Sequence, residues 1–487
     1  MNIRVDRFGG IQPRLHPSLL SDGMAVRARN VKLKSGKLVP LRQPAQMSDH
    51  SIYMEGGLTS IGLAKTLYPW KHTDRNGNVK VDFLAFPGVV SVAQGNLAAD
   101  EYDRLFVTGK TGVPFTDSDG NTWPDSPAVY MFDRQSNVIS RMTINKNPLE
   151  EAPEVSLKSG ESIDTDKTIY YVNFFASWVD AYGLESGLSP ASDATGSVAY
   201  GDVSPKPLTL NDGSTVQFSA MTLPPNAEKV YIYATSAGTS EATDGIQFFR
   251  EVSKSDATQS GGFQLKYNPA SLGEAEPGIE SPPGDLSGIV YVDGGFYAAF
   301  SPSSPHTVMF SDIGIVTSWP VAYRYDVKDN IVALATTSNS VFALTDGFPW
   351  VLSGTAPETM TAARLAGPAA CVSPRSVVVY RNAAYYASNE GYMVIANSAD
   401  AGTVCANLTD KIFTKDQWQS FGPSTCIAGQ HDGCIHLFFD GMNGLRIDLS
   451  ESVAAVTTHD ERASCMCVDD RDGNMYFVRK IRTEGGE

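Results

Sequence analysis

Short apolar runs separated by turns fill the C-terminal half of this 487-residue chain, and they constrain the fold more than any other feature. From Ile289 onward, β-branched and aromatic runs such as 376–379 and 384–387 follow one another almost without pause. Runs of this kind, bounded by Gly, Pro, Asn and Asp, are typical of β-strands. One helical turn is predicted within 408–418, with Thr414 as its N-cap. Because so many strands would leave many open edges in a flat sheet, we expect a closed or radial all-β architecture.

The first part of the chain has the same character. Strands are predicted at 81–86, 104–108, 128–133 and 138–144. Three turns have one chemistry, in which Asp and Asn side chains precede or follow a Gly: Asp74–Asn78, Asp117–Asn121 and Asp470–Asn474. Such residues provide the positive φ and the local hydrogen bonds of a hairpin turn. Their recurrence indicates blade-like repetition, and a β-propeller-like body is predicted.

Residues 151–280 break this pattern. A long aromatic strand is predicted at 168–178, followed by a Ser-Pro exit at Ser189. Val230 and Ile232 alternate with Tyr231 and Tyr233 in a later strand, which is the period of a sheet strand. About 100 residues with a turn every 8–12 suit one small immunoglobulin- or fibronectin-like β-sandwich. We interpret it as an insertion, because the earlier strand-turn pattern resumes after a Pro- and Gly-rich linker at 277–285.

Four parts are therefore predicted, in chain order. They are a basic arm and hairpin (1–42), the first part of the propeller (43–150), the inserted sandwich or platform domain (151–280) and the remainder of the propeller (281–487).

Charge is distributed unevenly along the chain. The formal net charge is −16, yet residues 1–42 carry nine basic and two acidic side chains, so the remaining residues carry −23. The basic residues of the arm are Arg4, Arg7, Arg14, Arg27, Arg29, Lys32, Lys34, Lys37 and Arg42. An acidic body repels phosphate, whereas a basic arm could dock onto an acidic neighbour, including another copy of the chain. Docking to protein is favoured, with DNA binding and a merely solvated arm as alternatives.

Several function classes lack their sequence signals. No apolar stretch approaches the ~20 residues that span a bilayer, so no stable membrane insertion is expected. The N-terminus has no secretory h-region, which favours synthesis in a cytoplasm. The six cysteines cluster in the last quarter of the chain and do not resemble a disulfide framework. There is no P-loop, no strand-linked GxGxxG and no nucleophile elbow. We therefore expect no enzyme activity and no cofactor.

Two metal hypotheses are weaker than their structural alternatives. The Asp-Gly-Asn turns could bind Ca²⁺, but they lack the spaced ligands of an EF-hand loop and are favoured as plain hairpin turns. Cys434, His436, Cys465 and Cys467 have the ligand types for Zn²⁺. Their C-x-H and C-x-C spacing on strands is more typical of buried packing residues.

Three regions together resemble a known protein family. The first, 8–41, has a Gly-Gly-Ile-x-Pro start and a Gly-x-Leu-x-Pro finish. The second is 168–192, and the third, 301–420, includes Thr345-Asp346-Gly347, Cys371–Ser376 and Asn389-Glu390-Gly391. In this order and spacing they resemble the tail nozzle proteins of short-tailed bacteriophages, also called tail tubular or tail hub proteins.

The resemblance implies a structural virion protein rather than an enzyme. Such proteins form a ring, typically of six copies, below the portal and a tail adaptor protein. The ring is the distal DNA conduit and gate: it retains packaged double-stranded DNA without sequence-specific binding and releases it on host contact. Tail fibres or spikes are further implied partners. An alternative of a different class is a glycan- or receptor-binding propeller of a phage tail, acting as an adhesin or spike.

Overall fold

The computed structural model describes most of the chain. The described residues are 8–34, 37–47, 50–55, 57–94, 100–109, 115–116, 122–123, 127–136, 138–193, 205–236, 245–338, 340–367, 369–398, 402–440, 442–449, 454–469 and 471–480. The chain divides into two compact units. The first comprises 1–143, 284–314 and 322–487, and the second comprises 144–283 with 315–321. The predicted insertion at 151–280 falls within the second unit.

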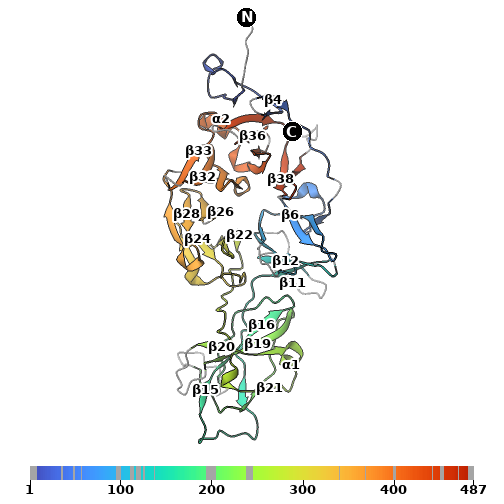
Figure 1. Ribbon diagram of the computed structural model, residues 1–487, viewed down its shortest axis with the longest axis vertical. Coiled ribbons are helices and arrows are strands. Elements are labelled where there is room, and N and C mark those ends of the chain that lie inside the picture. Colours follow the sequence, from blue (N-terminus) through green and yellow to red (C-terminus); the bar gives the residue numbers. More distant parts are fainter. Residues whose placement is uncertain are drawn as a thin grey trace. The chain divides into compact units, whose positions relative to one another are not determined.

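The first unit consists of small antiparallel sheets, or blades, that follow one another along the chain (Figure 1). Within the described residues there are seven of them. In order they are blade 1 (β5 Ile52–Met54, β6 Thr66–Thr73, β7 Val79–Phe86), blade 2 (β8 Val90–Gln94, β9 Leu105–Gly109, β12 Ala128–Asp133, β13 Val138–Thr143), blade 3 (β22 Ser287–Val292, β23 Phe296–Ser301, β24 Ser304–Phe310, β25 Arg324–Asp326), blade 4 (β26 Ile331–Thr337, β27 Ser340–Thr345, β28 Trp350–Ser353, β29 Thr361–Arg364), blade 5 (β30 Val378–Tyr380, β31 Ala383–Ala387, β32 Tyr392–Ser398, β33 Gly402–Asn407), blade 6 (β34 Ile427–His431, β35 Cys434–Phe438, β36 Gly444–Asp448, β37 Ala455–His459) and blade 7 (β38 Ala463–Val468, β39 Met475–Arg479).

These blades close into a ring, as the prediction of a β-propeller requires. The first strands of blades 2 to 7 contact one another in succession, from β8 and β22 to β34 and β38. Strand β38 of blade 7 then contacts β6 of blade 1, and blades 1 and 2 share one apolar cluster around Trp70 and Tyr130. The fold is therefore an all-β propeller. In blade 1 the outer strand β5 pairs with β7 in parallel, whereas the other neighbouring strands of the blades pair antiparallel.

Apolar packing between blades explains why central strands read as continuous hydrophobic runs. Strands β23, β27, β31, β35 and β36 are buried at every position because each lies between two neighbouring blades. Outer strands are more exposed, and β33 alternates exposed and half-buried residues. The sequence pattern detects the inner strands for this reason.

The second unit has one core between two sheets. One sheet has the order β14-β18-β21 and the other β16-β19-β20, and a short pair, β15-β17, lies beside them. Their bounds are β14 Val155–Leu157, β15 Tyr170–Val172, β16 Phe174–Asp180, β17 Leu208–Leu210, β18 Thr215–Phe218, β19 Ala227–Thr235, β20 Ile246–Ser253 and β21 Phe263–Lys266, with helix α1 at Lys254–Thr258. In the shared core Phe174 packs edge-on against Phe218 and at a tilt against Phe249. The arrangement is a sandwich; its immunoglobulin- or fibronectin-like character stays a prediction.

The N-terminal segment, 8–40, contains four short strands: β1 (Gly10–Ile11), β2 (Met24–Ala25), β3 (Val31–Lys34) and β4 (Lys37–Pro40). The hairpin predicted here is confirmed, because β3 and β4 pair antiparallel. A two-stranded pair, β10 (Phe115–Thr116) with β11 (Thr122–Trp123), follows blade 2's second strand. Among the described residues no helix is long and apolar enough to cross a bilayer.

Other local predictions have clear outcomes. Helix α2 (Lys415–Gln419) begins after Thr414, whose hydroxyl accepts the N–H of Gln417, so the predicted cap is confirmed. The Asp74 turn is also confirmed as a hairpin turn, because its carboxylate accepts the N–H groups of Asn76 and Asn78.

Candidate functional site

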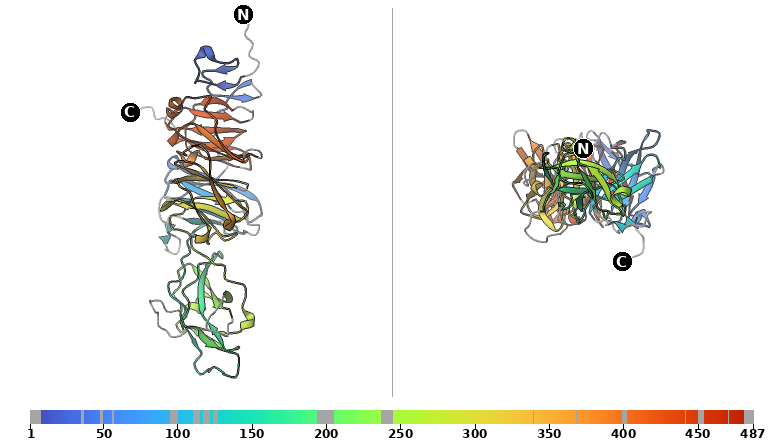
Figure 2. Two further views of the ribbon diagram at one scale, coloured as in Figure 1. Left: turned by 90° about the vertical axis from the view of Figure 1, so that its left-hand side faces the viewer. Right: turned by 90° about the horizontal axis from the view of Figure 1, so that it is seen from below.

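The predicted docking residues lie on the N-terminal segment, which packs against blades 5 and 6 (Figure 2). Ile11 and Ala28 of the segment are buried in the apolar cluster that these blades share. Arg14, Arg27, Arg29, Lys32 and Lys37 are described with their side chains. Arg4, Arg7 and the Lys34 side chain fall outside the described part of the structure.

Backbone hydrogen bonds join the segment to the outer edge of blade 6. The N–H of Asn30 donates to the carbonyl of Thr458 at 2.8 Å, and the N–H of Thr458 donates to the carbonyl of Ala28 at 2.9 Å. Arg29 and Thr458 thereby form a parallel bridge on strand β37. An open strand edge invites pairing with another chain, and here the chain's own N-terminal segment covers part of it.

Ion pairs reinforce this contact. Arg29 Nε lies 2.5 Å from Asp460 Oδ1, and Asn30 Nδ2 donates to the other oxygen of that carboxylate at 2.7 Å. The hydrogen bond from Arg29 lowers the pKa of Asp460 below its usual range. Lys32 Nζ lies 3.3 Å from Asp432 in the turn between β34 and β35. Part of the basic arm thus docks onto the acidic body of its own chain.

Other members of the basic set point to solvent. Arg27, Lys37 and Arg42 are exposed, and within the described residues none of them forms an ion pair. Two exposed apolar side chains accompany them: Val26 is 45% exposed and Leu38 is 48% exposed. The structure therefore divides the predicted set into residues used within the chain and residues left at the surface. Whether the latter contact another subunit or an adaptor stays a prediction.

The motifs that carry the family resemblance form turns of the propeller. In the β27–β28 turn, Asp346 accepts from the N–H and the side-chain amide of Asn330 at 3.0 and 2.8 Å. Glu390, in the β31–β32 turn, forms an ion pair of 2.5 Å with Lys415 of helix α2. A Cβ added at Gly391 would lie 2.3 Å from Asn407 Oδ1, so this position requires glycine. These residues fix blade geometry.

One motif residue joins distant blades. Arg375 lies in a 3-10 turn that precedes blade 5. Its guanidinium donates to the carbonyl of Lys65, beside blade 1, at 2.8 Å and also to the carbonyl of Ser464 in blade 7. Burial lowers the pKa of Arg375. A single side chain thus connects blades 1, 5 and 7 of the ring.

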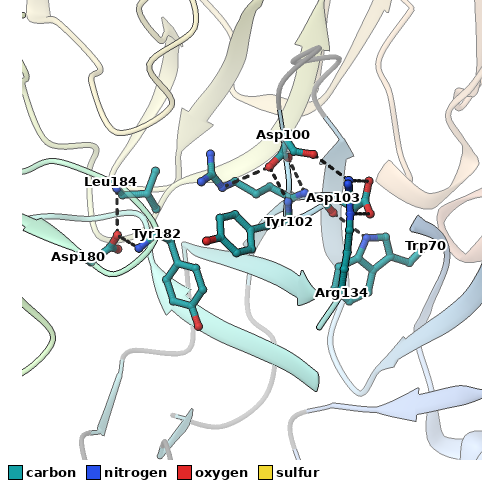
Figure 3. Close-up of polar contacts among 9 residues, drawn as sticks. Trp70, Asp100, Tyr102, Asp103, Arg134, Asp180, Tyr182 and Leu184 are labelled. Carbon is teal, nitrogen blue, oxygen red and sulfur yellow. Dashed lines mark hydrogen bonds and ion pairs between the residues drawn. The ribbon is translucent and has the colours of Figure 1, made fainter. Parts of the chain in front are cut away.

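A network in the turn before β9 joins blades 1 and 2 (Figure 3). Asp100 accepts the N–H groups of Tyr102 and Arg104 at 3.1 and 2.8 Å. Arg134 Nη2 donates to Asp103 Oδ1 at 3.2 Å, and the Asp103 carbonyl accepts from Trp70 Nε1 of blade 1 at 2.9 Å. Sequence reasoning did not single out these residues, because the contacts of Asp103 with Trp70 and Arg134 span about 30 positions and follow no motif.

Blade 6 contains buried polar side chains beside its apolar contacts with blade 7. The rings of His436 and His459 have centroids 5.8 Å apart. Both lie on the face of blade 6 against which Met466 of blade 7 packs. Arg446 lies opposite His436 across the strand pair and 3.5 Å from Asp448. Burial lowers the pKa of His459 to about 4 and holds the pKa of His436 well below its usual value.

The zinc hypothesis involved His436, one of these side chains. Among the described residues no group of three or more His, Cys, Asp or Glu side chains is placed to hold a metal ion. All six cysteines are free thiols. Burial raises the pKa of Cys434 to about 12, so this thiol is neutral at physiological pH.

The second unit contains a buried ion pair. Lys146 Nζ lies 2.6 Å from Asp180 Oδ2, and both side chains are fully buried. The other oxygen of Asp180 accepts the N–H groups of Tyr182 and Leu184, each at 2.9 Å (Figure 3). Burial lowers the pKa of Lys146 despite the opposing charge of Asp180. The pair joins the segment that precedes β14 to the end of strand β16.

The second unit also has a polar surface hollow of about 500 Å³. Gln217, Glu251, Gln259 and Gln264 contribute to its lining. Gln264 Nε2 donates to Gln217 Oε1 at 2.8 Å, so part of the polar surface is already paired.

Comparison with known proteins gives little similarity. The sequence matches no protein-family model. It matches no curated protein. Among solved structures, Hsv2 from Kluyveromyces lactis is 11% identical, with a TM-score of 0.28, over 52% of this chain and 67% of that chain. Apo AztD from Citrobacter koseri is 12% identical, with a TM-score of 0.28, over 63% of this chain and 76% of that chain. At these TM-scores neither likeness carries an argument about function, and the propeller assignment rests on the sheets of the chain itself.

Proposed function

We propose that this protein is a structural component of a phage tail, the nozzle or hub of a short-tailed bacteriophage. In the virion it forms an oligomeric ring that conducts, retains and releases DNA. The observation that carries the proposal is the ordered set of motifs at 8–41, 168–192 and 301–420. These motifs fall on the docked N-terminal segment, on the second unit and mainly on blades 3 to 5.

The contacts of the motif residues support a structural role. Asp346, Glu390 and Gly391 stabilise turns, and Arg375 ties three blades together. A conduit protein must hold its shape against the pressure of packaged DNA, and rigid inter-blade contacts serve that purpose.

In the proposed assembly the conduit lies between copies of the chain. The side chain of Arg375 joins blades 1, 5 and 7 of a single propeller, so its own ring of blades is bridged from within. A passage wide enough for double-stranded DNA therefore requires several copies side by side.

The charge of the molecule suits a conduit wall. Residues 144–283 contain 19 acidic and 8 basic side chains, a net charge of −11. Phosphate neutralisation by basic side chains makes proteins adhere to DNA. An acidic wall lacks this attraction, so DNA slides past it.

Assembly with a tail adaptor protein tests the proposal. We expect purified protein, mixed with the adaptor from the same virion, to form a complex whose mass by light scattering equals several copies of each chain. A protein that stays monomeric with its adaptor would contradict the proposal.

The second candidate is a glycan-binding tail propeller, and the polar hollow with Gln217 and Gln264 favours it. Calorimetric titration with host-surface polysaccharide separates the two. Saturable binding that Gln264→Ala abolishes would favour the adhesin, whereas no heat of binding, together with adaptor assembly, would favour the nozzle.

A further inference from the structure

The β3–β4 hairpin has an unusual environment for a two-stranded sheet. An isolated hairpin is marginally stable in water, and a third strand or a packed apolar face is needed for stability. Leu33 and Leu38 lie opposite each other in the register, so their side chains share one face. Leu33 is only half-buried, and Leu38 is 48% exposed. An apolar pair of the hairpin therefore remains partly uncovered by the chain's own body.

Exposed cations lie on the same segment, and by strand alternation Lys37 projects from the face of the hairpin opposite to Leu38. Arg27, Lys37 and Arg42 are exposed and form no ion pair with another described residue, whereas Arg29 and Lys32 contact Asp460 and Asp432. We call Val26, Arg27, Lys37, Leu38 and Arg42 the outward set. Apolar side chains with arginine, and with charge at the rim, are the composition of protein–protein interfaces.

We propose that the outward set is a docking surface for a second copy of this chain. The proposal rests on the ring of the proposed function and names the residues that join its copies. Charge complementarity argues for the occupant: the chain beyond residue 42 carries −23, so a neighbouring copy offers an acidic partner to Arg27, Lys37 and Arg42. The segment already shows this chemistry within one chain, where Arg29 and Lys32 bind acidic residues of blade 6.

Two variants of the full chain test the surface. The first is the triple reversal Arg27→Glu, Lys37→Glu and Arg42→Glu, and the second is Leu38→Ser. The matched control reverses three exposed lysines of the second unit, Lys158→Glu, Lys206→Glu and Lys266→Glu, with the same change in net charge. Circular dichroism and thermal unfolding verify that each variant folds. The readout is the oligomer mass by sedimentation and light scattering across a concentration series at low and high salt.

We expect the wild-type chain and the control to form the same oligomer. The triple reversal weakens assembly at least about tenfold, and so does Leu38→Ser, because burying one leucine contributes on the order of 2 kcal/mol. Added salt weakens assembly of the wild type and of Leu38→Ser, but has less effect on the triple reversal.

Four other outcomes would overturn the inference. An oligomer unaffected by either variant leaves the ring intact but places its interface elsewhere. If the control and the triple reversal weaken assembly equally, the loss of assembly is an effect of net charge and not of this surface. Loss of binding to duplex DNA without loss of the oligomer assigns the surface to nucleic acid. A wild-type chain that stays monomeric at every concentration, with and without the adaptor, overturns the proposed function as well.

Discussion

Gly10 lies where the N-terminal segment packs closely against blade 6. Its φ is +105°, and an added Cβ would lie 2.8 Å from the backbone nitrogen of Val456. Gly77, at the tip of the β6–β7 turn, has a φ of +80° but no atom within 4 Å of an added Cβ. Both glycines have a positive φ, but only Gly10 has neighbouring atoms that an added Cβ would overlap.

We therefore expect Gly10→Ala to cost more than Gly77→Ala. Strain at a positive φ costs about 1–2 kcal/mol at either position, and overpacking adds about 1–3 kcal/mol at Gly10 only. The measurement is the rate of limited proteolysis of residues 8–40, which should rise for Gly10→Ala and stay unchanged for Gly77→Ala. Equal rates would show that the segment is not held by this contact.

Lys146 and Asp180 make a second prediction at the residue scale. Lys146→Met leaves the buried carboxylate without its cation, which typically costs about 3–5 kcal/mol. The double variant Lys146→Met with Asp180→Asn removes both charges and keeps an oxygen for the N–H groups of Tyr182 and Leu184. In urea unfolding the double variant should recover most of the lost stability; a double variant as unstable as Lys146→Met would refute the ion-pair account.

At the level of single residues, the sequence predicts local geometry better than long-range contacts. The Thr414 cap and the Asp74 turn follow from side chains that bond to their own neighbours, so a short window contains the whole interaction. The Arg29–Asp460 pair joins positions 431 apart, and nothing in either local sequence specifies its partner. The sequence shows how many basic residues the arm has. Only the structure shows which of them pair with the body of the chain and which belong to the outward set.

Among the elements, inner strands are predictable and outer strands are less so. Strand β12 has the bounds predicted for it, 128–133, because a buried β-branched and aromatic run has few alternatives. Strand β33 was not predicted, since Gly, Thr and Asn in a partly exposed strand resemble a loop in composition. Strand β37 was not predicted either, although most of its residues are buried. The strand predicted at 376–379 begins later than expected, because Ser376 is the last residue of a 3-10 turn that starts at Pro374. Proline lacks the N–H that a strand ladder needs.

The blade 6–blade 7 interface predicts a dependence of stability on pH. His459 has a pKa of about 4 in the folded protein and about 6.5 when unfolded. The unfolded chain therefore binds more protons below pH 6.5, and stability falls as the pH decreases from about 6.5 to about 4. The groups around the two histidines include His431, Arg446, Asp460 and Glu461.

Urea unfolding at pH 7.5 and pH 5 measures this effect. We expect His459 alone to contribute about 2 kcal/mol of the difference between the two pH values. The variant His459→Gln should be less stable at pH 7.5 and lose this part of the pH dependence. An unchanged slope in the variant would mean that His459 titrates normally in the folded protein.

The whole molecule has three parts: a ring of blades, an acidic inserted unit, and a basic N-terminal segment that pairs with acidic residues of blade 6. The all-β class and the propeller were predictable because strand runs and turns recur along the chain. The number of blades was not, since blade 7 has two described strands and blade 1 has three, while blades 2 to 6 have four each. Sequence periodicity cannot count units of unequal size.

The proposed ring can be seen directly by electron microscopy of the purified protein, alone and mixed with the tail adaptor that the proposed function implies. The account predicts closed rings, six-fold by the family resemblance, whose central passage lies between propellers and whose contacts include the N-terminal segment. Single propellers without higher-order contacts, in samples where the adaptor is folded and present in excess, would contradict it.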